Sequence, residues 1–202
     1  MADNYAQDFY RQKRDALIKD FEKFRAEPYL DSELIPTIGY GTTAYPDGTK
    51  VTLNDPSITE ETANSYFQTH INEFNDHISK APGFGDLDEA TQAALGSFAY
   101  NTGPNVFTAP KGYETLQAAV KSGDKQQIAD AMKLYNNGGL AGLVRRREAE
   151  IDLMHTPLPP RPMPSNPPGM RQTRGVDLRT GSITSTPGVV DPKYNRRGRR
   201  VN

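Results

Sequence analysis

The chain has 202 residues and no cysteine, which excludes disulfide bonds, thiolate chemistry and cysteine-ligated zinc sites. Its formal charge of −1 conceals an acidic body and a basic tail. Residues 1–156 carry 15 Lys and Arg against 23 Asp and Glu, whereas residues 157–202 carry 9 against 2. We expect neither a signal peptide nor a transmembrane segment, because no apolar run approaches the roughly 20 residues of a membrane helix.

Residues 5–25 are expected to form the first helix. Leu17, Phe21 and Phe24 recur at helical spacing and form an apolar stripe. Glu22 lies at the edge of this stripe, in the last turn before a proline stops the helix. Partial burial and the negative end of the helix dipole both favour the protonated form of a carboxyl group.

Residues 29–53 change to β-type residues separated by glycine, proline and aspartate turn signals. They predict a small antiparallel sheet of short strands. Asp31 falls in one of the turns, and Thr37 begins a strand. Glu22, Asp31 and Thr37 therefore sit on three different local structures, which is how a short piece of chain can build a polar site.

A long helix to about residue 80 follows, and either Ser57 or Thr59 can cap its N-terminus. The rest of the body is expected to be helical, in these segments: 88–102, 113–121, 124–135 and 143–154. The expected fold class is α+β. A small β-containing N-terminal lobe and a helical C-terminal lobe would be joined by the long helix.

Residues 157–202 form a second region after the body of residues 1–156. Their first part is rich in proline, which opposes both helix and sheet. Apolar residues are too sparse in the remainder to offset the entropy of ordering the chain. We expect a disordered basic tail, either a solvated appendage or a segment that binds nucleic acid, an anionic surface or a virion protein.

Two carboxylates close together in the chain suit one particular reaction. Taken singly, Glu22 and Asp31 would be an ordinary surface residue and an ordinary turn residue. Hydrolysis of a glycosidic bond needs one carboxylic acid to protonate the leaving oxygen, and a second, ionised carboxylate on the other face of the sugar. Glu22, at the border of an apolar face, is the candidate acid. Asp31, in a polar turn, is the candidate ionised group.

These residues make the sequence resemble the phage-type lysozymes, glycoside hydrolase family 24. In that family a helix-borne Glu is followed 9 residues later by an Asp and 15 residues later by a Thr, the spacing of Glu22, Asp31 and Thr37. The threonine opens a Thr-Ile-Gly-Tyr-Gly strand, found here at residues 37–41. Two further signatures follow in the family's order: Ser-Phe-Ala-Tyr-Asn-Thr-Gly at 97–103 and Gly-Leu-Val-Arg-Arg-Arg-Glu at 142–148. The resemblance covers about residues 8–154.

The resemblance implies a lysozyme-like fold and a muramidase, an enzyme that hydrolyses the β-1,4 bond between N-acetylmuramic acid and N-acetylglucosamine in peptidoglycan. It also implies an inverting mechanism. Glu22 would be the general acid, and Asp31 and Thr37 would hold the attacking water. The carboxyl groups of an inverting pair are separated by roughly 6.5–9.5 Å to leave room for that water.

The family pattern further implies that an arginine of the C-terminal signature pairs with the catalytic Glu. The sequence leaves Arg145, Arg146 and Arg147 open, with Arg146 as our first choice. Near the site the chain departs from the family, because Lys23 and Leu34 stand where glycine is usual. Glycine supplies backbone dihedrals that other residues avoid, so any local difference is expected at these two positions.

The implied biological role is bacterial cell-wall degradation by a phage. A free endolysin would remain in the host cytoplasm until a holin releases it, whereas a virion lysozyme would travel in the particle; it would be a monomer unless docked there. Two alternatives remain open: a lytic transglycosylase, which needs Glu22 but no water-holding Asp31, and a non-enzymatic virion structural protein. No cofactor or metal is expected, because His70, His77 and His155 have no third ligand nearby.

Overall fold

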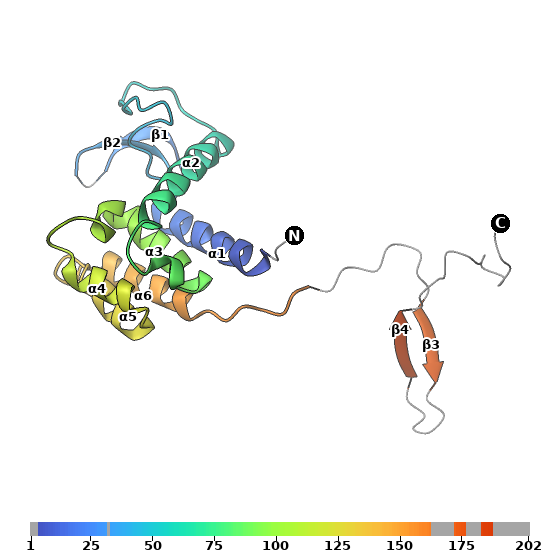
Figure 1. Cartoon of the computed structure of the whole chain (residues 1–202). Coiled ribbons are helices and arrows are strands. Elements are labelled where there is room, and N and C mark those ends of the chain that lie inside the picture. The colour runs from blue at the N-terminus through green and yellow to red at the C-terminus, as the bar shows by residue number, and fades with distance from the viewer. Residues whose placement is uncertain (1–3, 32, 163–171, 177–182, 188–202) are drawn as a thin grey trace, which may run out of the picture. The chain divides into compact units, whose positions relative to one another are not determined.

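A computed structural model describes residues 4–31, 33–162, 172–176 and 183–187 (Figure 1). The chain divides into two compact units, residues 1–159 and 160–202. The first unit contains, in chain order, α1 (Tyr5–Glu22), β1 (Arg25–Leu30), β2 (Pro36–Gly39), α2 (Glu60–Ile78), η1 (Phe84–Asp86), α3 (Glu89–Thr102), η2 (Pro104–Phe107), α4 (Glu114–Ser122), α5 (Lys125–Lys133) and α6 (Ala141–His155). The second contains β3 (Gln172–Val176) and β4 (Ile183–Pro187).

The first helix, α1, ends at Glu22 because the next residue turns the backbone. Lys23 has a φ of 56°, and its N–H donates to the carbonyl oxygen of Lys19 at 3.0 Å. The prediction of a helix to residue 25 is therefore wrong at its C-terminal end, and Phe24 lies outside the helix. As a result, Glu22 occupies the last position of α1, where the chain leaves for the sheet.

The small sheet consists of β1 and β2, paired antiparallel with Tyr29 opposite Thr37 and with an irregularity before Tyr29. Only isolated bridges continue the pairing after Gly39. The sheet is expected to extend to residue 53, but residues 51–53 do not form a strand. There the N–H and hydroxyl of Thr52 both bond to the carboxylate of Asp55, which closes a turn instead.

The long helix, α2, leads from the sheet to the C-terminal lobe (Figure 1). Of the two candidate caps, Thr59 is the one used and Ser57 is not: the hydroxyl of Thr59 accepts from the N–H of Thr62 at 3.1 Å. The buried face of α2 packs against Ile18 of α1 and against Tyr40, and this cluster forms the core of the N-terminal lobe.

The central helix of the C-terminal lobe is α3, whose residues 93–99 are all buried. Alanine, glycine and serine dominate this stretch, so neighbouring backbones and side chains approach closely. A Cβ added at Gly96 would lie 3.0 Å from Cδ of Arg14. On another face of α3, Ser97 reaches Glu150 of α6. The predicted α+β class, with two lobes and a long connecting helix, is confirmed.

In the second unit, β3 and β4 pair antiparallel, with Gln172 opposite Pro187 and Val176 opposite Ile183. These two stretches are strands where the sequence analysis expects a disordered tail. The proline-rich run from residue 163 and the arginine-rich end after residue 187 lie outside the described residues, so the nature of the tail as a whole stays a prediction. Within the described part of the chain, no helix is both long and apolar enough to cross a membrane.

Candidate active site

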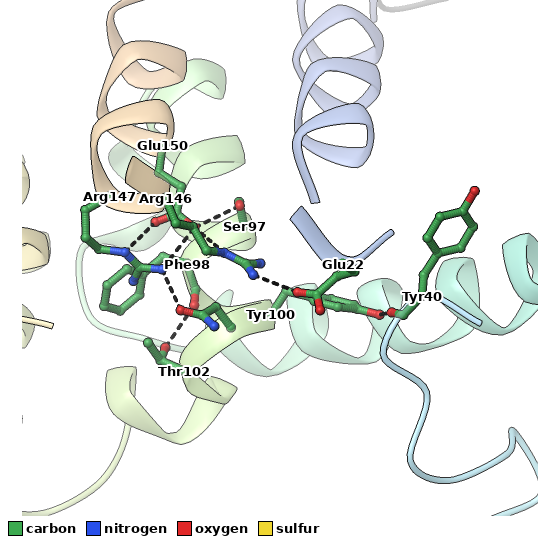
Figure 2. Close-up of polar contacts among 10 residues, drawn as sticks. Glu22, Tyr40, Ser97, Phe98, Tyr100, Thr102, Arg146, Arg147 and Glu150 are labelled. Atoms are coloured by element: carbon green, nitrogen blue, oxygen red, sulfur yellow. Dashed lines mark hydrogen bonds and ion pairs between the residues drawn. The ribbon is translucent and has the colours of Figure 1, made fainter. Parts of the chain in front are cut away.

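The carboxylate of Glu22 is held by an arginine that comes from the other end of the domain. Nη1 of Arg146 donates to Oε1 of Glu22 at 2.7 Å (Figure 2). The Arg146 side chain is almost fully buried, and that of Glu22 is 22% exposed. This pairing settles which of the three arginines approaches Glu22, because Arg145 is exposed and Arg147 turns towards Asn101.

The second carboxylate oxygen of Glu22, Oε2, faces the loop that contains Gly41. A Cβ at Gly41 would lie 3.2 Å from Oε2 of Glu22, and Gly41 has a φ of +84°. Glycine is required here both by the dihedral angle and by the approach of the carboxylate. The loop is tied to α3, since the hydroxyl of Tyr100 donates to the carbonyl oxygen of Tyr40 at 2.6 Å (Figure 2). Burial, and then the nearby charge of Glu22, raise the pKa of Tyr100.

Behind Arg146 lies a buried polar network centred on Glu150. Ser97 donates to Oε1 of Glu150 at 2.9 Å, and Nε of Arg146 approaches the same oxygen at 3.4 Å (Figure 2). Nε of Arg147 lies 3.1 Å from the other oxygen, and Nη2 of Arg147 also donates to Asn101 at 2.7 Å. Burial raises the pKa of the fully buried Glu150, and the two arginines oppose that rise.

Sequence reasoning missed Glu150, because the signature was read only as far as Glu148, which is exposed. The signal was nevertheless present. Glu150 follows Arg146 by four residues and Arg147 by three, the spacings at which helical side chains meet. The same spacing is common between charged residues on exposed helix faces. Here this face of α6 packs against α3, so the three side chains form a buried network.

Asp31 closes the tight turn between β1 and β2. Its Oδ1 accepts from the N–H of Glu33 at 2.8 Å and from the N–H of Ile35 at 2.9 Å. The turn is completed by the N–H of Leu34, which donates to the Asp31 carbonyl oxygen at 3.1 Å. Leu34 has a φ of 63°, the left-handed conformation that glycine adopts most easily. Backbone donors thus fix the orientation of the Asp31 carboxylate.

Thr37 lies in β2 with only 2% of its surface exposed. Its hydroxyl donates to the carbonyl oxygen of Ile35 at 3.0 Å, so its one proton is engaged, although its oxygen can still accept a hydrogen bond. Across the sheet from Thr37, Tyr29 interacts electrostatically with both candidate carboxylates. Burial, and then the charges of Glu22 and Asp31, raise the pKa of Tyr29 against the opposing charge of Arg25.

An open groove of about 710 Å³ lies between the turn that follows Asp31 and the C-terminal lobe, and neither Glu22 nor Asp31 is among its lining residues. Glu33 lines it on the side of the sheet, and Asn101, Tyr113 and Tyr135 line it on the other side. The rings of Tyr113 and Tyr135 are stacked, with centroids 6.1 Å apart and planes inclined by 15°. Tyr40, which precedes Gly41, is buried in the N-terminal lobe, and its hydroxyl donates to Glu60.

Two of the three histidines make hydrogen bonds away from Glu22. Nε2 of His77 lies 2.8 Å from the hydroxyl oxygen of Thr108, and Nδ1 of His155 lies 2.9 Å from the carbonyl oxygen of Ile151. Among the residues that the structure describes, there is no group of three or more His, Asp or Glu side chains that could hold a metal ion.

Comparison with known sequences relates the chain to one family. A family model described as Phage lysozyme matches residues 19–150. The chain is 33% identical over 165 residues to the endolysin of Lactococcus phage c2, and equally so to that of Lactococcus phage phivML3. Each match covers 79% of this chain and 64% of the relative, so the chain spans about 64% of the length of these relatives.

Comparison with solved structures points the same way. The chain is similar to an endolysin from Escherichia coli O157:H7 phage FAHEc1, with 32% identity and a TM-score of 0.61, covering 71% of this chain and 90% of that one. It is also similar to the muramidase domain of SpmX from Asticaccaulis excentricus, with 27% identity and a TM-score of 0.53, covering 71% of this chain and 95% of that one.

Proposed function

The chain belongs to the phage lysozyme family and has a lysozyme-like α+β fold, and on that basis we propose that it hydrolyses peptidoglycan as a muramidase. The bond cleaved is the β-1,4 bond between N-acetylmuramic acid and N-acetylglucosamine. The observation that carries the proposal is the setting of Glu22. It ends α1, pairs with a buried arginine and faces a glycine that leaves room for its second oxygen.

Glu22 acts as the general acid of this reaction. Its proton passes to the glycosidic oxygen as the bond from the anomeric carbon to that oxygen breaks. A water molecule attacks the same carbon from the opposite face and gives a proton to Asp31, so that the configuration inverts. The two backbone donors on Oδ1 of Asp31 support this role, because they keep the carboxylate in one orientation.

Thr37 binds the attacking water and does not contact the sugar. Its hydroxyl proton already points to the carbonyl oxygen of Ile35, which leaves its oxygen to accept a hydrogen bond from the attacking water. In this arrangement Thr37 orients the water, and Asp31 takes its proton. The separation of roughly 6.5–9.5 Å between the carboxyl groups of Glu22 and Asp31 stays a prediction of the inverting mechanism.

Part of the glycan chain lies in the groove that is lined by Glu33 and Asn101. The groove has the size of known ligand sites, and the stacked pair of Tyr113 and Tyr135 offers an apolar face against which a sugar ring can pack. Asn101 lines the same groove and is bonded to Arg147, which links the groove to the buried network. In biological terms, the protein degrades the cell wall during lysis, after holin-mediated release, or during entry as a virion component.

The test is a turbidity and zymogram assay on purified peptidoglycan. We expect Glu22→Gln to lower the rate of clearing by about 100-fold or more, because the amide cannot donate an acid proton to the leaving oxygen. Glu27→Gln removes one carboxylate from the exposed side of β1 and serves as the matched control, with clearing close to wild type.

Two outcomes would count against this function. Clearing by Glu22→Gln at the wild-type rate would remove Glu22 from the chemistry, and absence of clearing by the wild type would favour a non-enzymatic virion protein. Analysis of the products separates the remaining alternative. Reducing muramic acid ends indicate hydrolysis, whereas 1,6-anhydro ends indicate a lytic transglycosylase.

A further inference from the structure

The buried charges around Arg146 do not cancel on their own. Arg146 and Arg147 are two cations that share one fully buried carboxylate, Glu150, at 3.4 Å and 3.1 Å. The second anion of the cluster is Glu22, which only Arg146 reaches, at 2.7 Å. With both carboxylates ionised, the four groups sum to zero. With Glu22 protonated, one positive charge remains.

The general acid must nevertheless carry a proton before it can donate one. A buried arginine beside a carboxyl group favours the ionised form, and two arginines without a buried counter-charge would favour it more strongly. Glu150 offsets one of the two positive charges from the side of Arg146 that faces away from Glu22. It also accepts from Nε of Arg146, which leaves the Nη1 end of the guanidinium directed at Glu22 (Figure 2).

Among the described residues, no carboxylate other than Glu22 and Glu150 forms an ion pair with Arg146 or Arg147. Around Glu150, the groups contributed by α3 are neutral: Ser97 bonds to it directly, and Asn101 bonds to Arg147. Around Glu22, α3 contributes the hydroxyl of Tyr100, and β1 contributes that of Tyr29. The remaining arginine of the signature, Arg145, is exposed, and its charge interacts with Asp20 of α1 more weakly than Lys23 does.

We propose that Glu150 is a positioning residue of the reaction, which holds Arg146 and sets the pH range over which Glu22 keeps its proton. This role deepens the proposed function and rests on Glu22 as the general acid. Glu150 touches neither the sugar nor the water. It acts through Arg146, and Ser97 fixes it in place from α3.

The direction in which Glu150 shifts the protonation of Glu22 can be tested with two substitutions that change the local charge in opposite senses. Glu150→Gln keeps the shape of the side chain but removes its negative charge, so the alkaline limb of the kcat–pH profile should move to lower pH. Arg147→Gln removes a positive charge and should move the limb to higher pH. We expect about one pH unit in each direction, the size of a unit-charge change across one guanidinium at an effective dielectric constant near 20.

Two controls separate this electrostatic role from a structural one. Glu148→Gln makes the same charge change on the exposed side of the same helix and should leave the limb in place. The double variant Glu150→Gln/Arg147→Gln removes one charge of each sign and should bring the limb back towards the wild-type position. A role in folding alone predicts instead that the double variant is worse than either single one.

A second readout does not depend on activity. In 13C-labelled protein, the carboxyl carbon of Glu22 is assigned by its loss in Glu22→Gln, and its NMR titration is followed in each variant that circular dichroism shows to be folded. We expect the titration midpoint to fall in Glu150→Gln and to rise in Arg147→Gln. If Glu150→Gln does not fold, Arg147→Gln and the double variant supply the comparison.

The proposal is overturned if the midpoint and the alkaline limb stay fixed, if both single variants move them in the same direction, or if Glu148→Gln moves them equally. Failure of the proposed function gives a different result. In that case the wild type does not clear peptidoglycan, yet the titration of Glu22 still responds to the charge at position 150.

Discussion

At the scale of single residues, two positions show how the chain manages without expected glycines. Lys23 and Leu34 both adopt a positive φ, of 56° and 63°. Leu34 occupies the left-handed position of a short hairpin loop, where glycine is the usual residue because a Cβ costs about 1–2 kcal/mol there. Its side chain is 74% exposed, so it gains little from burial in return. The turn that orients Asp31 is therefore strained.

This strain makes a stability prediction. Leu34→Gly should raise the free energy of unfolding by about 0.5–1 kcal/mol, because relief of the left-handed strain exceeds the backbone entropy that glycine adds to the unfolded chain. Urea denaturation of the wild type and the variant measures the change.

The matched control is Ile35→Gly, the next residue along the chain, which has no positive φ. It should lower stability, since it adds entropy to the unfolded chain without relieving strain. If both variants changed stability in the same direction, that result would contradict the proposed strain at Leu34.

At the scale of elements, α6 distributes three consecutive arginines over three directions. Successive residues of a helix point about 100° apart, because one turn takes 3.6 residues. Arg145 therefore faces solvent, Arg146 faces Glu22, and Arg147 faces Asn101 and the interior. A run that reads as one basic surface patch is in fact divided between solvent, the site and the core, and Glu150 joins the two buried members.

The N-terminus of α2 gives a prediction at the same scale. Thr59→Ala should lower the free energy of unfolding by about 1 kcal/mol, because the N–H of Thr62 loses the side-chain acceptor that caps the helix. Ser57→Ala, at the other residue that the sequence allows as a cap, should change stability by less than about 0.5 kcal/mol. Thermal or urea unfolding of both variants distinguishes them, and equal losses would show that Thr59 does not act as the cap.

At the scale of the whole molecule, two tyrosines tie the loops of the N-terminal lobe to carboxylates. Tyr40 donates to Glu60 at 2.7 Å, and Tyr45 donates to Asp55 at 2.8 Å. Burial, and then the bond to the facing carboxylate, raise the pKa of Tyr40 to about 12, and the same causes raise the pKa of Tyr45 to about 12. In an unfolded chain, tyrosine titrates near pH 10.

Stability should therefore fall at alkaline pH. The folded state holds these protons more tightly than the unfolded state does, so the contribution is complete below about pH 10 and is lost as the pH rises towards 12. We expect the free energy of unfolding, measured by urea denaturation at a series of pH values, to decline across this window.

The double variant Tyr40→Phe/Tyr45→Phe should be less stable at neutral pH, because two hydrogen bonds are lost. It should also decline less steeply between pH 10 and 12, because neither ring can titrate. Parallel curves for the wild type and the double variant would assign the alkaline loss to other groups.

Much of the fold and part of the candidate site follow from local sequence. The helix stripe, the glycine-rich strand and the capping residues depend on contacts between near neighbours, and so does the turn around Asp31. The family signatures added the order of the lobes. Lys23 and Leu34 stand where the family usually has glycine, and both adopt the positive φ that glycine favours.

What the sequence by itself determined is the set of local elements and the placing of Glu22 at a helix end, because these depend on short-range periodicity and on turn chemistry. Tertiary structure alone decided that Arg146 is the partner of Glu22, 124 residues away along the chain, and that Glu150 is the buried anion behind it. It also decided that Thr37 is buried, with 2% of its surface exposed. The pairing of Arg146 with Glu22 and the burial of Glu150 depend on how α6 packs against α3 and on which groups that packing removes from water, and the spacing of residues does not reveal either.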